Sequence, residues 1–473
     1  MIKCLNLIFF VLLSTYMISA QVGIGTDSPS ASSILDVDST TEGVLLPRMT
    51  SAQRNAIPDP GNGLTVFDTD QQSYYFYNSS ESSWERLNSS RLERDNYVLV
   101  KSQDDFPKVS SGKITLDTNT FYEINGRVVL DTPIILNGAY VAGLDPSEDI
   151  LVKPNGNAFE GSGGSIRNIT ITGGGNVFNI TSGASLLVQN TIIASMSSVG
   201  TISGLGFVFL SNVQYLDNSN GVVYSDINNL LLNNQAWQAD NTGTYEKFVG
   251  NFDLIQKASG FSIANGGAVA IDVSEDPNVG DGVINGTVFS GSSASYINKY
   301  TTAGINLNFT KDWFVQASGI QDEYDDVSTG NLYTTQTLST GYIQTITNNG
   351  ALKLTGETSS SNLLRFTTDT DLNNRLTYNG SSSRTFRINA SLSVRGLDQS
   401  DLFYTFFIRK NGETTLVETN SILFVSNFRN VSSISITGTV ELKPQDYVEI
   451  WIQRLGGSGN SRIVIFSQNL IID

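Results

Sequence analysis

The sequence contains no histidine, and its single cysteine is Cys4. A Ser-His-Asp triad, a zinc site with His and Cys ligands, a haem ligand and a catalytic cysteine are therefore excluded. A disulfide is excluded as well once the first residues are removed. Catalysis would have to rest on carboxylates, and no metal or cofactor is expected.

Basic residues are also few, because 28 Lys and Arg stand against 45 Asp and Glu and give a net charge of −17. Nucleic-acid binding needs a basic surface that releases counterions, so a nucleic-acid partner is not expected. Binding to an anionic membrane surface is disfavoured for the same reason.

Long apolar patterns with a 3.6-residue period are missing, and strong helix formers are sparse. The chain has 43 Gly, only 10 Pro and many Ser, Thr and Asn residues. This composition is typical of an all-β protein.

A repeat in the middle of the chain gives the first positive signal. Asn168, Asn190, Asn212 and Asn234 lie 22 residues apart, each in or beside a short apolar, β-branched run. A fixed period in the low twenties favours a parallel β-helix with one coil per period. Stacked asparagines at one corner of each coil would share amide hydrogen bonds, although chance remains the alternative in an Asn-rich chain. The register beyond Asn234 is unclear, because the next position in the period is Gln256.

Residues 1–20 have the pattern of a secretory signal, with Lys3 before the apolar run from Leu7 to Leu13 and a small residue, Ala20, at the end. The run is shorter than the about 20 apolar residues that span a bilayer. We expect a mature chain from Gln21 that is secreted or lies on the cell surface, with no membrane span.

Residues 21–90 form a distinct module by their pattern of short strands and turns. The motifs are QVGIGT at 21–26, SILDV at 33–37, GVLLPRMT at 43–50 and GLTVFDTD at 63–70, followed by a run of aromatic residues at 74–77. Together they resemble an N-terminal module common in exported proteins of Bacteroidetes. The resemblance implies a role in attachment or assembly and no chemistry.

Residues 91–310 contain apolar triplets separated by Gly, Asn and Asp turns. The order of these segments resembles the β-helical shaft of phage tail fibres and tailspikes, so a right-handed parallel β-helix is expected here. Residues 311–347, with Trp313 and the acidic cluster at 322–326, are predicted to be a cap or linker that covers the open strand edge.

Residues 348–473 show the alternation of half-buried antiparallel strands, and Asn411-Gly412 is a strong hairpin signal. The turn at 410–412 and the segment at 442–449 resemble the C1q/TNF-like jelly rolls at the tips of trimeric fibres. The resemblance implies a jelly-roll tip domain and a homotrimer.

Carboxylates are the only candidates for catalysis, since glycoside hydrolysis needs just two of them. The weak candidates are Asp272, Glu275, Asp276 and Asp281, together with the cluster at 322–326. Turn-forming or solvated carboxylates are the favoured alternative. The loop at 276–281 lacks the EF-hand spacing, so no metal site is predicted.

The sequence thus favours a non-enzymatic trimeric fibre that binds a glycan or a protein receptor on a cell surface. Tyr404, Tyr447 and Trp451 are possible ligand contacts in the tip, with positions in the core as the alternative. Two other hypotheses stay open: a receptor-binding tail fibre of a phage virion, and a tailspike-like enzyme that cleaves glycans.

Overall fold

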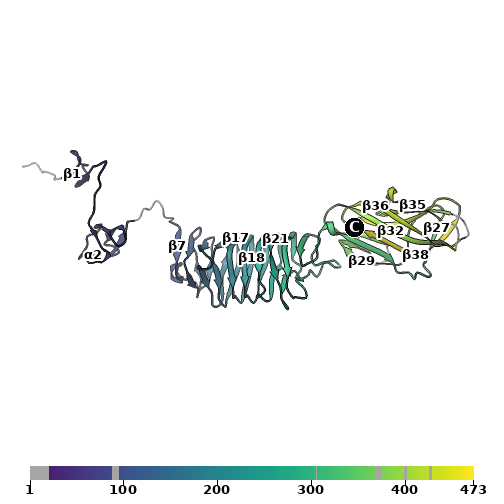
Figure 1. Ribbon diagram of the computed structural model, residues 1–473, viewed down its shortest axis with the longest axis horizontal. Coiled ribbons are helices and arrows are strands. Elements are labelled where there is room, and N and C mark those ends of the chain that lie inside the picture. Colours follow the sequence, from purple (N-terminus) through teal and green to yellow (C-terminus); the bar gives the residue numbers. More distant parts are fainter. Residues whose placement is uncertain (1–20, 88–94, 305, 369–373, 399–401, 426–428) are drawn as a thin grey trace, which may run out of the picture. The chain divides into compact units, whose positions relative to one another are not determined.

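The computed structural model describes residues 21–87, 95–304, 306–368, 374–398, 402–425 and 429–473 (Figure 1). The chain divides into two compact units, Met1–Arg94 and Asp95–Asp473, which are treated separately below. The expected signal segment, residues 1–20, lies outside the described residues. Within the described ranges, no helix is long and apolar enough to cross a membrane.

The N-terminal unit is built from two small sheets. Strands β1 (Val22–Ile24) and β2 (Leu35–Val37) pair in parallel. The second sheet has the order β3-β4-β5-β6. Its elements are β3 (Arg48–Met49), the helix α2 (Ser51–Asn55), β4 (Thr65–Asp68), β5 (Ser73–Asn78) and β6 (Ser83–Arg86). Helix α2 begins with a capping box formed by Thr50 and Gln53.

This unit has little apolar core of its own. Arg54 forms an ion pair with the buried Asp68 at 3.2 Å, and its guanidinium lies 3.8 Å from the ring centre of Tyr75. Many of its large apolar side chains are exposed, as a surface made for contact with another chain would have them. They are Val22, Ile24, Ile34, Leu35, Val37, Val44, Leu45, Leu64 and Leu87.

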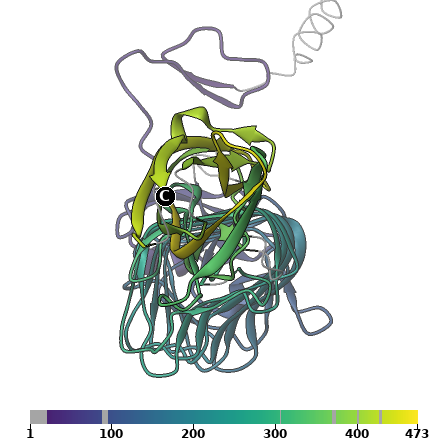
Figure 2. The same ribbon diagram turned by 90° about the vertical axis from the view of Figure 1, so that its right-hand side faces the viewer.

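The first part of the second unit is a parallel solenoid of 19 strands in one continuous sheet (Figure 1). Figure 2 shows its coils superposed along the stacking direction. The strands are β7 (Tyr97–Val100), β8 (Ile114–Thr115), β9 (Phe121–Ile124), β10 (Arg127–Val129), β11 (Ile134–Ile135), β12 (Tyr140–Ala142), β13 (Ile150–Val152), β14 (Asn157–Ser162), β15 (Ser165–Arg167), β16 (Thr170–Thr172), β17 (Asn176–Ala194), β18 (Ser198–Leu216), β19 (Val222–Trp237), β20 (Thr244–Val249), β21 (Asn251–Ile263), β22 (Val269–Asp272), β23 (Asn278–Ser290), β24 (Ile297–Asn298) and β25 (Trp313–Ser318).

Like residues stack in columns along the solenoid. In one interior column, Ile166, Val188, Leu210 and Leu232 pair in register from coil to coil, and all four are buried. Each coil alone has no core, and stacking buries one continuous apolar interior. The handedness of the helix stays a prediction.

The four asparagines form a ladder at one corner of the coils. The Nδ2 of Asn190, Asn212 and Asn234 donates to the Oδ1 of the asparagine one coil earlier, at 3.1, 3.1 and 2.6 Å. All four have a positive φ, between 48° and 54°, which asparagine tolerates better than most residues. In these four coils the corner combines a left-handed backbone with a side-chain amide that bonds to the neighbouring coil.

The coils lengthen after Asn234, and this explains why the period is lost there. Leu231 pairs with Gln256, so this coil has 25 residues instead of 22. The corner position passes to Ser259, with a φ of 54°, and then to Gly286, with a φ of 69°. The left-handed corner continues without the asparagine side chain.

A buried ion pair interrupts the apolar interior at this point. Lys257 follows Leu232 in the interior column, and its Nζ lies 2.9 Å from Oε1 of Glu246, with both side chains at most 2% exposed. Burial raises the pKa of Glu246 above its usual value, against the attraction of Lys257. A single sequence gave no signal that these two residues meet inside the solenoid.

Residues 311–347, predicted to be a cap or linker, contribute strands to both the solenoid and the next domain. Strand β25 pairs in parallel with β23, so the solenoid extends to Ser318 and not to residue 310. The last coil, from Gly282 to Trp313, spans 31 residues, which conceals its repeat. Strands β26 (Thr329–Thr334) and β27 (Tyr342–Thr347) already belong to the next domain.

The C-terminal sandwich, residues 329–473, consists of two antiparallel sheets. Sheet I has the order β29-β26-β38-β32-β36, with β27 also paired to β38. Its further strands are β29 (Thr358–Leu364), β32 (Arg384–Gly396), β36 (Ser432–Leu442) and β38 (Asn460–Ile472). Sheet II has the order β30-β31-β37-β33-β34, with β28 on β37 and β35 on β33. These strands are β28 (Ala351–Lys353), β30 (Phe366–Thr367), β31 (Arg375–Tyr378), β33 (Leu402–Lys410), β34 (Thr414–Thr415), β35 (Ser421–Val425) and β37 (Tyr447–Arg454).

The sandwich core lies between these sheets and includes Phe386, Phe406, Ile450 and Ile465. The all-β class and the β-solenoid are confirmed, while the jelly-roll topology and the trimer stay predictions.

Candidate functional site

Asp272, the first carboxylate candidate, accepts hydrogen bonds from two other residues. It ends β22 and accepts hydrogen bonds from the backbone N–H and hydroxyl of Ser274 at 2.9 and 2.7 Å, and from Nδ2 of Asn298 at 3.1 Å. Burial opposes its ionisation, but these hydrogen bonds outweigh burial and hold its pKa below the usual value. An ionised carboxylate with three donors is held in place and is a poor proton donor.

Glu275 and Asp276 connect neighbouring coils. Oε1 of Glu275 lies 2.5 Å from Nζ of Lys247. Asp276 accepts a hydrogen bond from the backbone N–H of Thr301 at 2.7 Å, and another from the hydroxyl of the same residue. Hydrogen bonds from Thr301 and Thr302 lower the pKa of Asp276. A catalytic role for these two residues stays an untested hypothesis.

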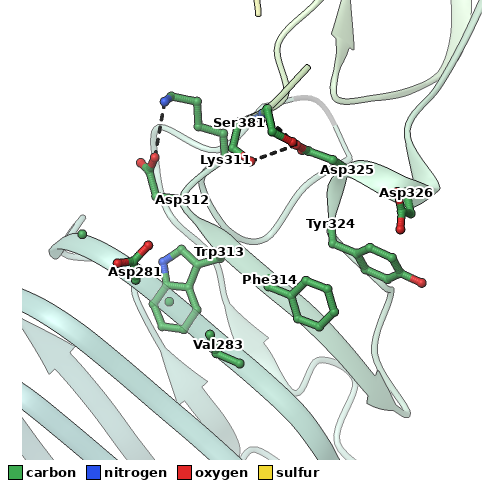
Figure 3. A pocket seen from close by; sticks show the side chains of 13 residues that line it. Asp281, Val283, Lys311, Asp312, Trp313, Phe314, Tyr324, Asp325, Asp326 and Ser381 are labelled. Carbon is green, nitrogen blue, oxygen red and sulfur yellow. Dashed lines mark hydrogen bonds and ion pairs between the residues drawn. The ribbon is translucent and has the colours of Figure 1, made fainter. Parts of the chain in front are cut away.

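Asp281 lies in a pocket of about 400 Å³ between the last coils and the sandwich (Figure 3). The walls come from β23, from β25 with the segments beside it, and from the loop before β32. The lining residues are Gly280, Asp281, Gly282, Val283, Lys311, Asp312, Trp313, Phe314, Tyr324, Asp325, Asp326, Ser381 and Ser382.

Three of the four carboxylates in this pocket have partners. Asp325 accepts hydrogen bonds of 2.8–3.2 Å from the backbone and hydroxyl of both Ser381 and Ser382. Burial opposes ionisation of Asp325, but these bonds hold its pKa low. Asp312 lies 3.3 Å from Lys311, and Asp326 lies 3.5 Å from Arg384. Asp281 forms no ion pair with any residue that the structure describes.

The aromatic wall of the pocket is Phe314 against Tyr324, with ring centres 4.7 Å apart (Figure 3). Behind this wall, Arg365 of the sandwich donates to the carbonyl of Trp313 at 2.9 Å and of Glu323 at 3.3 Å. The pocket can accept hydroxyl groups on its carboxylates and place an apolar face on Phe314. Among the described residues, no group of three or more carboxylates, histidines or cysteines is placed to hold a metal ion.

The tip residues singled out in the sequence divide between core and surface. Tyr404 is buried between the sheets at 3% exposure, so this possible contact is a core residue. Tyr447 and Trp451 lie half-buried on the outer face of sheet II, because alternate residues of a strand face opposite sides. The guanidinium of Arg375 lies over Tyr447 and that of Arg409 over Trp451, both at 4.1 Å.

A buried carboxylate joins these two aromatic residues. Glu449 is 2% exposed and accepts hydrogen bonds from Nε1 of Trp451 at 3.1 Å and from Nζ of Lys353 at 3.0 Å. Arg375 lies 3.5 Å from the same carboxylate. The side chains on this part of the outer face are thereby fixed before any ligand arrives.

The sequence analysis missed a groove beside this cluster. It has a volume of about 290 Å³ and runs over β33 between β35 and β37. Its lining residues are Thr405, Phe407, Arg409, Thr415, Asn420, Ile422, Gln453 and Leu455. Alternation along β33 could have placed its odd-numbered residues on one face, but the pairing of β35 with β33 has no local signal.

Residues 23–103 match the family model of a phage tail like trimerisation region. This part of the chain is therefore phage-tail-like, and the match suggests a homotrimer. No curated protein matches the sequence.

Among solved structures, the enzymatically active domain of tailspike protein 4 from bacteriophage CBA120 is 10% identical, with a TM-score of 0.24 over 90% of this chain and 77% of that one. ORF18 of Geobacillus virus E2 is 10% identical, with a TM-score of 0.18 over 85% of this chain and 90% of that one. Eiger TNF from S. frugiperda is 9% identical, with a TM-score of 0.20 over 30% of this chain and 90% of that one. Similarities at this level carry no argument about function.

Proposed function

We propose that this protein is a non-enzymatic, trimeric, fibre-like adhesion protein whose C-terminal sandwich binds a glycan or protein on a cell surface. The observation that carries the proposal is the outer face of sheet II, where Tyr447, Trp451 and their arginines are held rigid around the buried Glu449. Rigid aromatic and arginine side chains are the residues that dominate recognition surfaces. The trimerisation region supports display of three such faces, which turns weak single contacts into avid binding.

Two carriers of such a fibre are compatible with a phage-tail-like trimerisation region. One is a secreted or cell-surface protein, and the other is a receptor-binding fibre in the tail of a virion. Antibodies against residues 329–473, applied to washed cells and to purified virions, distinguish the two carriers.

A glycan-cleaving activity is the second candidate, and the junction pocket is the observation that favours it. Asp281 without an ion pair faces the same space as Phe314 and Tyr324. Retaining and inverting glycosidases both require a second carboxylate at a defined separation, whereas the other three in this pocket are held by partners. Asp281→Asn removes any activity of this pocket and leaves adhesion through sheet II intact.

Residues 21–473 are incubated with washed bacterial cells and with envelope preparations to test adhesion. We expect retention that saturates and that falls sharply for the isolated subunit obtained by dilution. Absence of retention on every surface, with a folded and trimeric protein, overturns the proposal.

A further inference from the structure

We propose that the groove over β33 on the outer face of sheet II is a binding site for an acidic glycan chain. This inference rests on the proposed adhesion function and specifies the site and the chemical class of its ligand. Three observations carry it: an aromatic platform, an arginine that takes part in no ion pair among the described residues, and the distance between these two features.

The platform adjoins the groove, since Phe403 precedes the lining residue Thr405 by two positions on β33. Phe403 and Phe424 pair across β33 and β35, their ring centres lie 4.8 Å apart, and they are 54% and 45% exposed. Ile422 and Leu455 continue this apolar surface into the groove. Two large exposed rings held against each other offer a flat face of the kind on which the C–H side of a sugar ring packs.

The floor of the groove contains Thr405, which is 6% exposed. Gln453 at the rim is held by a hydrogen bond of 2.9 Å from its Nε2 to the carbonyl of Asn349.

The groove itself carries a positive charge. Arg409 donates to Oγ1 of Thr415 at 3.1 Å and to the carbonyl of Gly412 at 3.3 Å, and it stacks on Trp451 at 4.1 Å. None of the ion pairs between residues that the structure describes includes Arg409. Although the whole chain is acidic and Glu449 lies opposite in the strand register, the oriented guanidinium of Arg409 offers a local positive charge to an anionic group of the ligand.

The distance between the aromatic platform and Arg409 favours an extended glycan chain over a single sugar as the ligand. Phe403 and Arg409 face the same side of β33 and are six residues apart, or roughly 20 Å at about 3.3 Å per residue. An extended polysaccharide with carboxylate groups can contact both features at once. A second copy of this protein is the competing occupant, and the experiment below includes it.

Binding of the full mature chain to immobilised polygalacturonate and to immobilised dextran tests the inference. We expect retention on polygalacturonate that decreases with salt, and at least about tenfold weaker retention on dextran. Phe424→Ala weakens binding to polygalacturonate about tenfold or more, because it removes half of the platform. Arg409→Gln removes the preference for the acidic polymer over the neutral one.

The matched control is Tyr333→Ala, which truncates an aromatic side chain of 37% exposure on β26 in sheet I. It leaves binding unchanged, and circular dichroism and molar mass show that all variants fold and assemble as the parent does. Equal binding by Phe424→Ala and the parent overturns the inference. A changed molar mass for Phe424→Ala also overturns it, because a second copy then covers this face.

The two proposals fail in different ways. Retention on bacterial cells without retention on polygalacturonate sinks the acidic-glycan inference and leaves the adhesion function standing. Absence of retention on both cells and polymers removes the adhesion function itself.

Discussion

The asparagine ladder allows the most detailed prediction, because one residue makes two bonds of the same kind. Asn212 donates to Asn190 at 3.1 Å and accepts from Asn234 at 2.6 Å. Its φ of 54° adds a backbone requirement that glycine satisfies and alanine does not. The substitution Asn212→Gly therefore removes the two hydrogen bonds without straining the backbone.

The expected loss follows from these bonds. Each exposed amide bond contributes about 0.5–1 kcal/mol net, so two contribute about 1–2 kcal/mol. The greater freedom of glycine in the unfolded chain adds about 0.5–1 kcal/mol. Asn212→Ala loses the same bonds and adds a left-handed strain of about 1–2 kcal/mol.

A control separates the two contributions. Asn348 has a φ of 52°, and its side chain makes no hydrogen bond to any residue that the structure describes. Asn348→Gly therefore reports the glycine effect alone. Urea denaturation followed by circular dichroism, at one subunit concentration, compares the free energies of unfolding. Equal losses for the two glycine variants refute the claim that the ladder stabilises the solenoid.

Three further predictions concern buried charges. Lys257→Met leaves Glu246 buried without its ion-pair partner and destabilises the solenoid by about 3–5 kcal/mol, while adding Glu246→Leu restores most of this stability. Burial raises the folded-state pKa of Glu246 above its unfolded-state pKa of about 4.5. The stability of Lys257→Met therefore falls as the pH rises from the unfolded-state pKa through the folded-state pKa. Thermal unfolding at several pH values measures this loss. Hydrogen bonds from Ser381 and Ser382 hold the pKa of Asp325 low against the effect of burial. The contribution of Asp325 to stability is therefore complete above its unfolded-state pKa and is lost as the pH falls through its folded-state pKa. Asp325→Asn removes this acid dependence from limited proteolysis of the junction. Asp272→Asn lowers the melting temperature, because it weakens the hydrogen bonds that Asp272 accepts, and it leaves retention on cells unchanged. If Asp272 were catalytic, the substitution would instead abolish cleavage of the glycan.

The solenoid could be predicted from the sequence where its coils have equal length. An amide ladder requires the same residue at the same corner, so Asn168 to Asn234 recur at a constant spacing. The prediction failed where the coils lengthen, because a coil can add residues in a turn without changing the stacked strands. This is why β25 was placed outside the solenoid.

The candidate site was less predictable, because it depends on pairings between distant segments. Alternation indicates that Tyr447 and Trp451 share one face, but not whether that face is inside or outside the sandwich. Tyr404 is in the core since it alternates with the outward-facing Phe403. The contact between Phe403 and Phe424 arises from the register of β33 with β35, which no local pattern encodes.

Retention and cleavage, measured together on envelope and capsule polysaccharides with residues 21–473, test the central claim most directly. The account predicts saturable retention of the trimer on the polysaccharide without release of new reducing ends. New reducing ends that appear in proportion to protein and time would contradict it, and the junction pocket around Asp281 would then be the first place to look for the active site.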